Sequence, residues 1–308
     1  MEHKKFFILN PTAGKGKGSK YILRLQKTLD ELAIPLENIL LTEYPGHATE
    51  LASSLAQDVN SIFCIGGDGT VNEIINGISN ICNYRLGVIP VGSGNDFART
   101  IGTLNKDFSL GDYIIKKESK QCDIGQVTVS RNNKVFLSRK FISSLGLGFD
   151  AFVASKIKSI KILRGLSLYI SSVVLSLFTY KVPKSSIKIA EHNVDFTDHI
   201  FLFSVGNTET AGGGFRLNPK AQIDDRYLNL CMARNISKFT LLKVLPKAIN
   251  GTHIFDKRVE SYKFKTLKYT THENIYLHVD GEVIELAEGE KEIEINILPD
   301  SQSVITNQ

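Results

Sequence analysis

A glycine-rich stretch beginning at Gly66 is the part of the chain best suited to hold a phosphate. The apolar run Ile62–Ile65 has the length of a buried strand, and Gly66-Gly67-Asp68-Gly69-Thr70 ends it. The following residues carry apolar side chains at the i, i+3, i+4 spacing of a helix. Glycines lack the Cβ atoms that would hold a phosphate away, and a helix N-terminus attracts negative charge. We therefore expect a nucleotide phosphate at this turn.

Asp68 indicates a site that carries out a reaction on the phosphate rather than one that only binds it. A carboxylate beside a phosphate is repelled unless a metal ion or a transferable proton lies between them. Mg²⁺ prefers a few carboxylates together with phosphate oxygens, so Asp68 could hold it directly or through water. Asp96, in a later glycine-rich turn, is a candidate for the same region, although it or Asn95 could instead cap the helix that starts at Phe97.

Two further glycine-rich turns follow apolar segments that we expect to be strands. Because these strands alternate with helices, the sequence predicts a parallel sheet. Such sheets bind ligands beyond the carboxyl ends of their strands, so all three turns should emerge at one edge. The expected strands are Phe6–Leu9, Ile39–Thr42, Ile62–Ile65 and Leu86–Ile89, and the expected helices are Tyr21–Leu32, Ala48–Ala56, a segment from Val71 and a segment from Phe97.

The pattern changes near Cys122 to short segments that alternate with period two and lack intervening helices, which is typical of an antiparallel sandwich. Helical segments interrupt it at 151–180 and 238–250. We predict an α/β domain over 1–122, a β-sandwich domain over 123–298, and a tail at 299–308 that packs back on the first domain. The expected strands are Gly125–Val129, Val135–Phe141, Ile187–Ala190, Ile200–Val205, Tyr227–Cys231, Ile275–Val279 and Ile293–Leu298.

Composition narrows the function classes. Hydrophobic residues make up 42% and charged residues 22% of the 308 positions, as in ordinary globular proteins. The net charge of +5 suits anionic ligands or an anionic membrane surface, but it is too small to argue for nucleic acid. The apolar stretch Leu166–Tyr180 is shorter than the roughly 20 residues that span a bilayer, so we expect a soluble protein. The scattered cysteines, which favour reduced thiols over a zinc site or disulfides, are Cys64, Cys82, Cys122 and Cys231.

The glycine-rich turns do not follow the two commonest nucleotide patterns. Counting from Gly14, Ser19 stands where a Walker A loop has its second glycine, and Asn72 and Phe97 break the Rossmann spacing. Each turn alone could be a structural strand-to-helix connection. Three of them on one sheet edge, two with an aspartate, favour a ligand site.

Taken together, these residues resemble the diacylglycerol kinase catalytic-domain family, and most closely its soluble bacterial lipid kinases. The similarity covers nearly the whole chain. It implies an α/β domain of the NAD kinase and phosphofructokinase type, then a β-sandwich domain for the lipid substrate. The motifs that carry it are Asn10-Pro11-x-x-Gly14, Gly66–Thr70 with Asn72-Glu73, Gly92–Arg99, Gly148–Ala151, Gly212–Gly214, Pro219-x-Ala221-x-x-Asp224-Asp225 and Asp280-Gly281-Glu282.

The resemblance implies ATP-dependent phosphorylation of a lipid hydroxyl, first of all diacylglycerol to phosphatidic acid, as a step of phospholipid biosynthesis. Phosphoryl transfer needs a positioned triphosphate, a metal that neutralises its charge, and an oriented acceptor hydroxyl. Lys15 or Lys17 could help to position the triphosphate. Ser93 replaces the threonine usual in the family and keeps its hydroxyl. The residues that would line the ATP site are Asn10, Pro11, Thr12, Ala13, Gly14, Thr42, Gly66, Gly67, Asp68, Gly69, Thr70, Val71, Asn72 and Ser93.

Asp280-Gly281-Glu282 has two interpretations. Asp-Gly between apolar runs is a strong hairpin-turn signal. The resemblance instead implies that the motif carries the general base, and we favour Glu282 with Asp280 as its partner, while either carboxylate remains a candidate. A base on the second domain facing a nucleotide on the first would place catalysis in the cleft between the domains.

Asp224-Asp225 also has two interpretations. Adjacent acids in a turn are commonly only solvated. The resemblance implies a structural Mg²⁺ bound by the Asp225 side chain and by the backbone carbonyls of Gln222 and Tyr227. Arg226 stands where the family normally has glycine, and a bulky cation there could alter the loop or weaken the metal.

A basic segment with Lys156, Lys158, Lys161 and Arg164 precedes the apolar run 166–178. It could touch an anionic membrane and admit a lipid, or it could belong to a helix that packs on the sandwich and exposes its lysines. We expect a cytoplasmic enzyme that visits the inner face of the membrane and has no nucleic-acid partner. The sequence leaves the oligomeric state open, a homodimer included.

Three rival functions share some of these features. An NAD kinase also has Gly-Gly-Asp-Gly-Thr, but the motifs at Asn10 and Gly92 fit lipid kinases better. A kinase for another lipid alcohol, such as a sphingoid base, ceramide or phosphatidylglycerol, would carry the same motifs. A nucleotide-sensing regulator without catalysis would have lost the carboxylates, and all of them are present.

Overall fold

The computed structural model describes residues 4–55, 59–78, 84–157 and 165–307, and the side chains of all of these except 157 and 165–171. The chain forms two compact units, one of residues 1–123 with 299–308 and the other of residues 124–298. Of the residues singled out from the sequence, Ala56, Cys82, Lys158, Lys161 and Arg164 lie outside the described residues.

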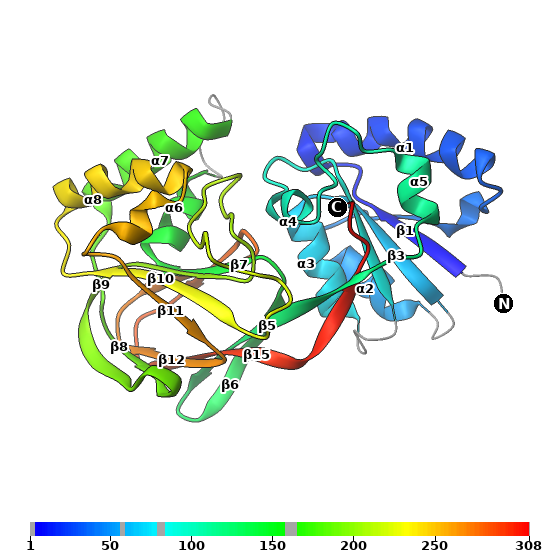
Figure 1. Ribbon diagram of the computed structural model, residues 1–308. Coiled ribbons are helices and arrows are strands. Elements are labelled where there is room, and N and C mark those ends of the chain that lie inside the picture. The colour runs from blue at the N-terminus through cyan, green and yellow to red at the C-terminus, as the bar shows by residue number, and fades with distance from the viewer. Residues whose placement is uncertain (1–3, 56–58, 79–83, 158–164, 308) are drawn as a thin grey trace. The chain divides into compact units, whose positions relative to one another are not determined.

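The first unit is built on a parallel sheet (Figure 1). Its strands are β1 (Lys4–Leu9), β2 (Ile39–Leu41), β3 (Val59–Gly66) and β4 (Arg85–Pro90), in the spatial order β2-β1-β3-β4. The end of β15 (Lys291–Val304) continues the sheet, because Val304 pairs in parallel with Leu86. The apolar residues of β1, β3 and β4 are buried, as expected for a parallel sheet covered on both faces.

Helices cover both faces of this sheet (Figure 1). On one face, α1 (Ala13–Glu31) and α5 (Leu110–Ile115) share a core with alternate residues of β1 and β3, such as Phe7 and Phe63. On the other face lie α2 (His47–Ser54) and α3 (Asp68–Gly77), while α4 (Asp96–Thr100) follows the glycine-rich turn after β4. The predicted α/β class is confirmed. Helix α1 begins eight residues before the predicted Tyr21, with Gly14, Lys15 and Gly16 in non-helical conformations in its first turn.

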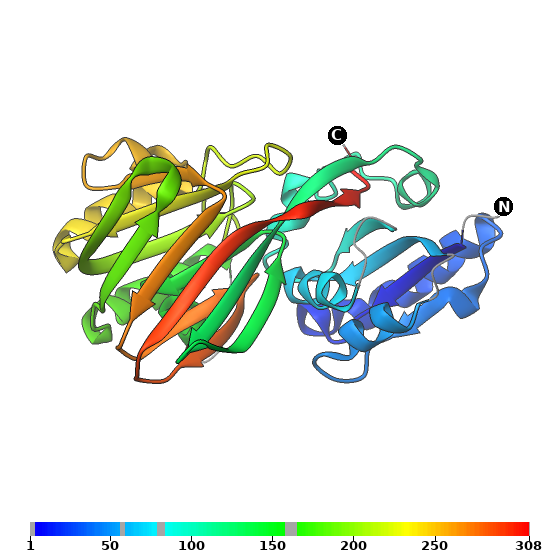
Figure 2. The same cartoon turned by 90° about the horizontal axis from the view of Figure 1, so that it is seen from below.

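The second unit is a sandwich of two largely antiparallel sheets, as predicted (Figure 2). The long strand β9 (Val194–Gly206) belongs to both, because its first half pairs with β8 and its second half with β7 and β10. The other strands are β5 (Lys120–Arg131), β6 (Lys134–Phe141), β7 (Ser144–Gly148), β8 (Lys184–Ile189), β10 (Leu228–Arg234), β11 (Glu260–Phe264), β12 (Thr266–Thr271), β13 (Ile275–Val279) and β14 (Glu282–Leu286).

Three helices lie together on one side of the sandwich (Figure 1): α6 (Phe149–Ile157), α7 (Gly165–Thr179) and α8 (Lys238–Val244). Their buried side chains, among them Phe149, Leu177 and Leu241, form a core with Phe201 of β9. Within the described residues, no helix is both long enough and apolar enough to span a bilayer. Short 3-10 helices complete the chain at Leu36–Asn38, Ala190–His192, Leu245–Ile249 and Thr252–Phe255.

Candidate active site

The three glycine-rich turns of the first unit lie against one another. The Gly66 carbonyl oxygen accepts hydrogen bonds from the backbone N–H groups of Val91 and Gly92, at 2.9 and 3.2 Å. A Cβ atom added to Gly92 would stand 2.5 Å from the Gly67 Cα, and one added to Gly14 would clash with the Val91 carbonyl oxygen. The turns after β1, β3 and β4 can therefore pack this closely only because glycine occupies these positions.

Asn10 connects the first turn to the second. Its Nδ2 donates to the Thr70 Oγ1 at 3.1 Å, and its Oδ1 accepts from the Thr12 N–H at 3.0 Å. Its backbone N–H donates to the Ile65 carbonyl oxygen at 2.9 Å. Asn10 is thus anchored to β3 and to the first turn of α3. Nearby, the Thr42 N–H donates to the Leu9 carbonyl oxygen at 2.9 Å, which extends the pairing of β2 with β1 beyond Leu41.

The Asp68 carboxylate links the second turn to the third. Asp68 begins α3, and its Oδ1 accepts the Phe97 N–H at 3.2 Å, in the first turn of α4. Asp96, the first residue of α4, is 6% exposed. Asn95 has a left-handed backbone, with φ of 56°, and its Nδ2 donates to the Gly92 carbonyl oxygen at 2.9 Å. The Asp68 carboxylate of the neighbouring turn thus caps α4, and the Asn95 side chain makes no capping hydrogen bond.

The carboxylates of this region affect the pKa of a buried cysteine in β3. Cys64 is fully buried in β3, and burial raises the pKa of its thiol. The Asp68 and Glu73 carboxylates add to this increase in the pKa. Glu73, which belongs to the motif seen in the sequence, has a structural contact: its Oε2 accepts the Ala48 N–H at 3.1 Å and so caps α2.

The remaining residues expected at the ATP site lie on the same turns or on α3. Ser93 and the side chains of Lys15 and Lys17 are exposed, whereas Val71 and Asn72 are buried in α3. The structure therefore gathers the expected residues of all three turns in one region.

In the second unit, Asp280 and Gly281 form a two-residue turn between β13 and β14. Their φ angles are 47° and 84°, and the flanking Val279 and Glu282 are paired. Two consecutive positive φ angles define the tight turn that suits the twist of a hairpin. The hairpin interpretation of this motif is confirmed, and it is compatible with a catalytic role for its carboxylates.

The two carboxylates of the turn have different surroundings. Asp280 is 4% exposed. Its Oδ1 accepts the N–H groups of Ser143 and Ser144, both at 2.9 Å, and its Oδ2 accepts the Ile142 N–H at 3.0 Å. Glu282 has a half-buried side chain, 34% exposed, and its Oε2 lies 3.0 Å from the Arg139 Nη1. Asp280 therefore holds the backbone that leads into β7, while Glu282 is accessible and is oriented by an arginine.

A buried pair of side chains beside this hairpin was not identified from the sequence. His278 of β13 and Asp150 of α6 are in contact, with 3.1 Å between Nε2 and Oδ2, and both are less than 9% exposed. A Cβ atom on Gly146 of β7 would stand 2.5 Å from each side chain. The only signal available was Asp150 in the motif Gly148–Ala151, because the histidine lies 128 residues away in the sequence.

The Asp225 loop is held by contacts that the sequence did not predict. Asp225 Oδ1 accepts the Tyr227 N–H at 3.0 Å, and its Oδ2 accepts from the Lys263 Nζ at 2.5 Å. Arg226 has a left-handed backbone, with φ of 63°. Among the described residues, no group of three or more histidine, cysteine or acidic side chains gathers as a metal site. The Asp225 carboxylate, expected from the resemblance to bind a metal, is thus in contact with an ammonium group.

Comparison with known proteins is consistent with both units. Residues 4–127 match the model of the diacylglycerol kinase catalytic domain, and residues 143–306 match that of the YegS C-terminal NAD kinase beta sandwich-like domain. A protein named diacylglycerol kinase from Staphylococcus saprophyticus is 30% identical, and the alignment covers 92% of this chain and 90% of the relative.

Solved structures show the same fold. A diacylglycerol kinase from Bacillus anthracis superposes with a TM-score of 0.71 at 22% identity, covering 99% of this chain and 97% of the other. An NAD kinase from Archaeoglobus fulgidus in complex with ATP gives a TM-score of 0.52 at 13% identity, covering 99% and 94%. Fold and site define a phosphotransferase with an α/β unit and a β-sandwich unit. The chain belongs to the diacylglycerol kinase family, a family of lipid kinases.

Proposed function

We propose that this lipid kinase transfers the γ-phosphate of ATP to the hydroxyl of diacylglycerol and so forms phosphatidic acid. The observation that carries the proposal is the packing of three glycine-rich turns at the carboxyl ends of β1, β3 and β4, within a matched kinase domain. Close-packed turns without Cβ atoms, joined to the N-terminus of α3, can surround a triphosphate with backbone N–H groups.

In this proposal the first unit holds the nucleotide. The turn at Asn10–Gly14, the segment Gly66–Asn72, Thr42 and Ser93 contact ATP, and Lys15 or Lys17 adds positive charge near the phosphates. Asp68 and Asp96 provide the carboxylates that suit a nucleotide-bound Mg²⁺. Mg²⁺, when bound, would neutralise the charge of the phosphates.

The second unit supplies the base. Glu282 accepts the proton of the lipid hydroxyl while the hydroxyl oxygen forms its bond to the γ-phosphorus and the bond to ADP breaks. Its exposure, together with the Arg139 ion pair that orients it, supports this assignment. Asp280 supports the backbone through its three hydrogen bonds and acts as a positioning residue.

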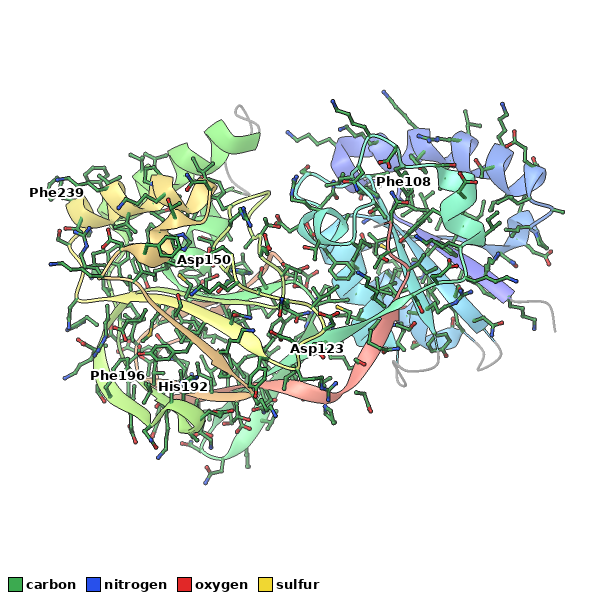
Figure 3. All side chains as sticks on the ribbon, in the orientation of Figure 1. Phe108, Asp123, Asp150, His192, Phe196 and Phe239 are labelled. Atoms are coloured by element: carbon green, nitrogen blue, oxygen red, sulfur yellow. The ribbon has the colours of Figure 1, made fainter. Side chains whose placement is uncertain are left out.

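We also propose that the enzyme meets its lipid at the cytoplasmic face of the membrane, where ATP is available. Leu175 and Phe178 of α7 are 60% and 71% exposed, and Phe239 of α8 is 77% exposed and points away from the sandwich (Figure 3). The Lys238 Nζ donates to the Phe178 carbonyl oxygen at 3.4 Å, so a lysine of α8 contacts the backbone at the end of α7. Exposed aromatic side chains with adjacent lysines suit an anionic lipid surface.

The acceptor is tested by transfer of radiolabelled γ-phosphate from ATP with Mg²⁺. Diacylglycerol and ceramide are presented in mixed micelles, NAD in buffer, and a reaction without acceptor measures hydrolysis. We expect labelled phosphatidic acid above that background. Labelled NADP without labelled lipid would assign the protein to NAD phosphorylation, and labelled ceramide phosphate alone would replace the acceptor while retaining the kinase.

A further inference from the structure

The loop 222–227 of the second unit is organised by a lysine from a neighbouring strand. Lys263 lies on β11, opposite Asn229 of β10, and β10 begins directly after the loop. Its Nζ is 2.5 Å from the Asp225 Oδ2, with the carboxylate only 16% exposed. In Figure 3 the labelled His192 lies beside the backbone of Lys263, because its Nε2 is 2.6 Å from the Lys263 carbonyl oxygen.

The rest of the loop is adapted to the same arrangement. The second Asp225 oxygen accepts the Tyr227 N–H at 3.0 Å, which closes a local turn around the carboxylate. The Lys265 Nζ lies 5.1 Å from the centre of the Tyr227 ring, so a second lysine of the same segment contacts the loop. Arg226 adds a third cationic side chain within one residue of Asp225.

We propose that the Lys263 ammonium takes the place of a divalent cation in this loop, so that the second unit needs no Mg²⁺ at Asp225. A direct ammonium–carboxylate contact supplies the positive charge and the hydrogen bond that would otherwise come from a metal and its ligands. A divalent ion on the same carboxylate would lie within a few ångströms of the ammonium and be repelled by it. The proposal does not depend on the nucleotide or on the lipid acceptor.

Arg226 is consistent with a loop that has lost its metal. A glycine adopts its left-handed backbone without strain, whereas arginine does so at a cost. A short residue would also leave room for a hydrated ion and its carbonyl ligands.

Thermal unfolding without nucleotide tests the proposal. The wild-type chain should have the same Tm in EDTA and in millimolar Mg²⁺. Lys263→Met keeps most of the side chain and removes the ammonium, so its Tm should fall in EDTA and recover by about 2–4 °C in Mg²⁺. The matched control is Lys268→Met, because Lys268 is similarly exposed and paired to Glu292, and its Tm should not respond to Mg²⁺.

Mn²⁺ binding, followed by electron paramagnetic resonance, gives a readout that does not depend on the stability of the Lys263 variant. The wild type and Asp225→Asn should bind the same amount of Mn²⁺, because Asp225 holds no metal in the wild type. Lys263→Met should bind more Mn²⁺ than the double variant Lys263→Met/Asp225→Asn. The proposal is overturned if the wild type binds Mn²⁺ that Asp225→Asn loses, or if Mg²⁺ raises the wild-type Tm but not that of Asp225→Asn.

Discussion

Gly92 and Gly67 lie so close that a Cβ atom on Gly92 would stand 2.5 Å from the Gly67 Cα. This contact joins the turn after β4 to the turn after β3, and the Asp68–Phe97 hydrogen bond joins the same two turns one residue further on. The nucleotide site proposed for the first unit depends on this close packing. It also identifies the positions at which one added methyl group should weaken ATP binding and lower the stability of the first unit.

Gly92→Ala should weaken ATP binding and destabilise the first unit by about 1–3 kcal/mol, because the new methyl must push the turns apart. The control is Gly111→Ala in α5, where a Cβ would meet only the Thr28 Cγ2, at 3.9 Å. That variant should be neutral or gain up to about 1 kcal/mol. Denaturant unfolding and nucleotide-binding calorimetry measure both effects. Equal affinities for the two variants would show that the packed turns do not shape the nucleotide site.

Asp280→Asn should destabilise the protein by at least about 2 kcal/mol. The carboxylate accepts three backbone N–H groups, and an amide would place a donor against one of them. Strain is not the cause, because asparagine tolerates the left-handed backbone of this position. Glu282→Gln should cost under about 1 kcal/mol, since it removes a half-exposed ion pair. A stable Asp280→Asn that is inactive, beside an active Glu282→Gln, would transfer the role of base to Asp280.

The surface formed by α7 and α8 should bind anionic vesicles. Phe178→Ser with Phe239→Ser should weaken sedimentation with phosphatidylglycerol vesicles by about tenfold for each phenylalanine that would enter the lipid. The control is Leu23→Ser on α1, whose side chain is 76% exposed. If all three substitutions change vesicle binding equally, the α7–α8 surface is not the site of contact.

His253 should make stability fall in weak acid. It is buried, its Nε2 lies 3.1 Å from the Leu217 carbonyl oxygen, and burial lowers its pKa from 6.5. The unfolded chain therefore takes up a proton at a higher pH than the native chain, so this stability is present above about pH 6.5 and is lost below it. Between pH 6.5 and 5.5 the loss should approach about 1 kcal/mol.

Urea unfolding of the wild type and of His253→Gln at several pH values isolates this contribution. The variant will be less stable throughout, but its free energy of unfolding should depend less on pH in this range. Identical pH slopes for the two proteins would mean that the histidine does not remain neutral in the native state.

Much of the fold could be predicted from local pattern. Glycine turns after buried runs located three parallel strands, and period-two alternation located β13 at its observed bounds. β7, β11, β12 and β14 were missed. β7 is buried throughout and so does not alternate, only Lys265 separates β11 from β12, so that no turn signal divides them, and β14 shows no clear alternation of buried and exposed residues. The early start of α1 was missed because its first turn contains left-handed glycines that look like a loop in the sequence.

The chemistry of the candidate site was less visible. Asp68, Asp280 and Glu282 could be singled out because they lie within short motifs. The residues that contact these side chains in the fold could not be identified from the sequence. Arg139 contacts Glu282 across 143 residues, and Lys263 contacts Asp225 across 38, so only the strand pairing of the folded unit brings them together. For the same reason a sequence cannot show whether Asp280 is a base or a support for neighbouring backbone.

The most direct test of the proposed reaction is turnover of ATP and diacylglycerol by Asp68→Asn and Glu282→Gln, with nucleotide binding measured on the same preparations. Asp68→Asn should lose both turnover and tight binding of Mg²⁺–ATP. Glu282→Gln should bind ATP as the wild type does and lose about 10²–10⁴-fold in kcat, the usual contribution of a general base. Normal turnover by both variants would contradict the account of this protein as a lipid kinase that uses these carboxylates.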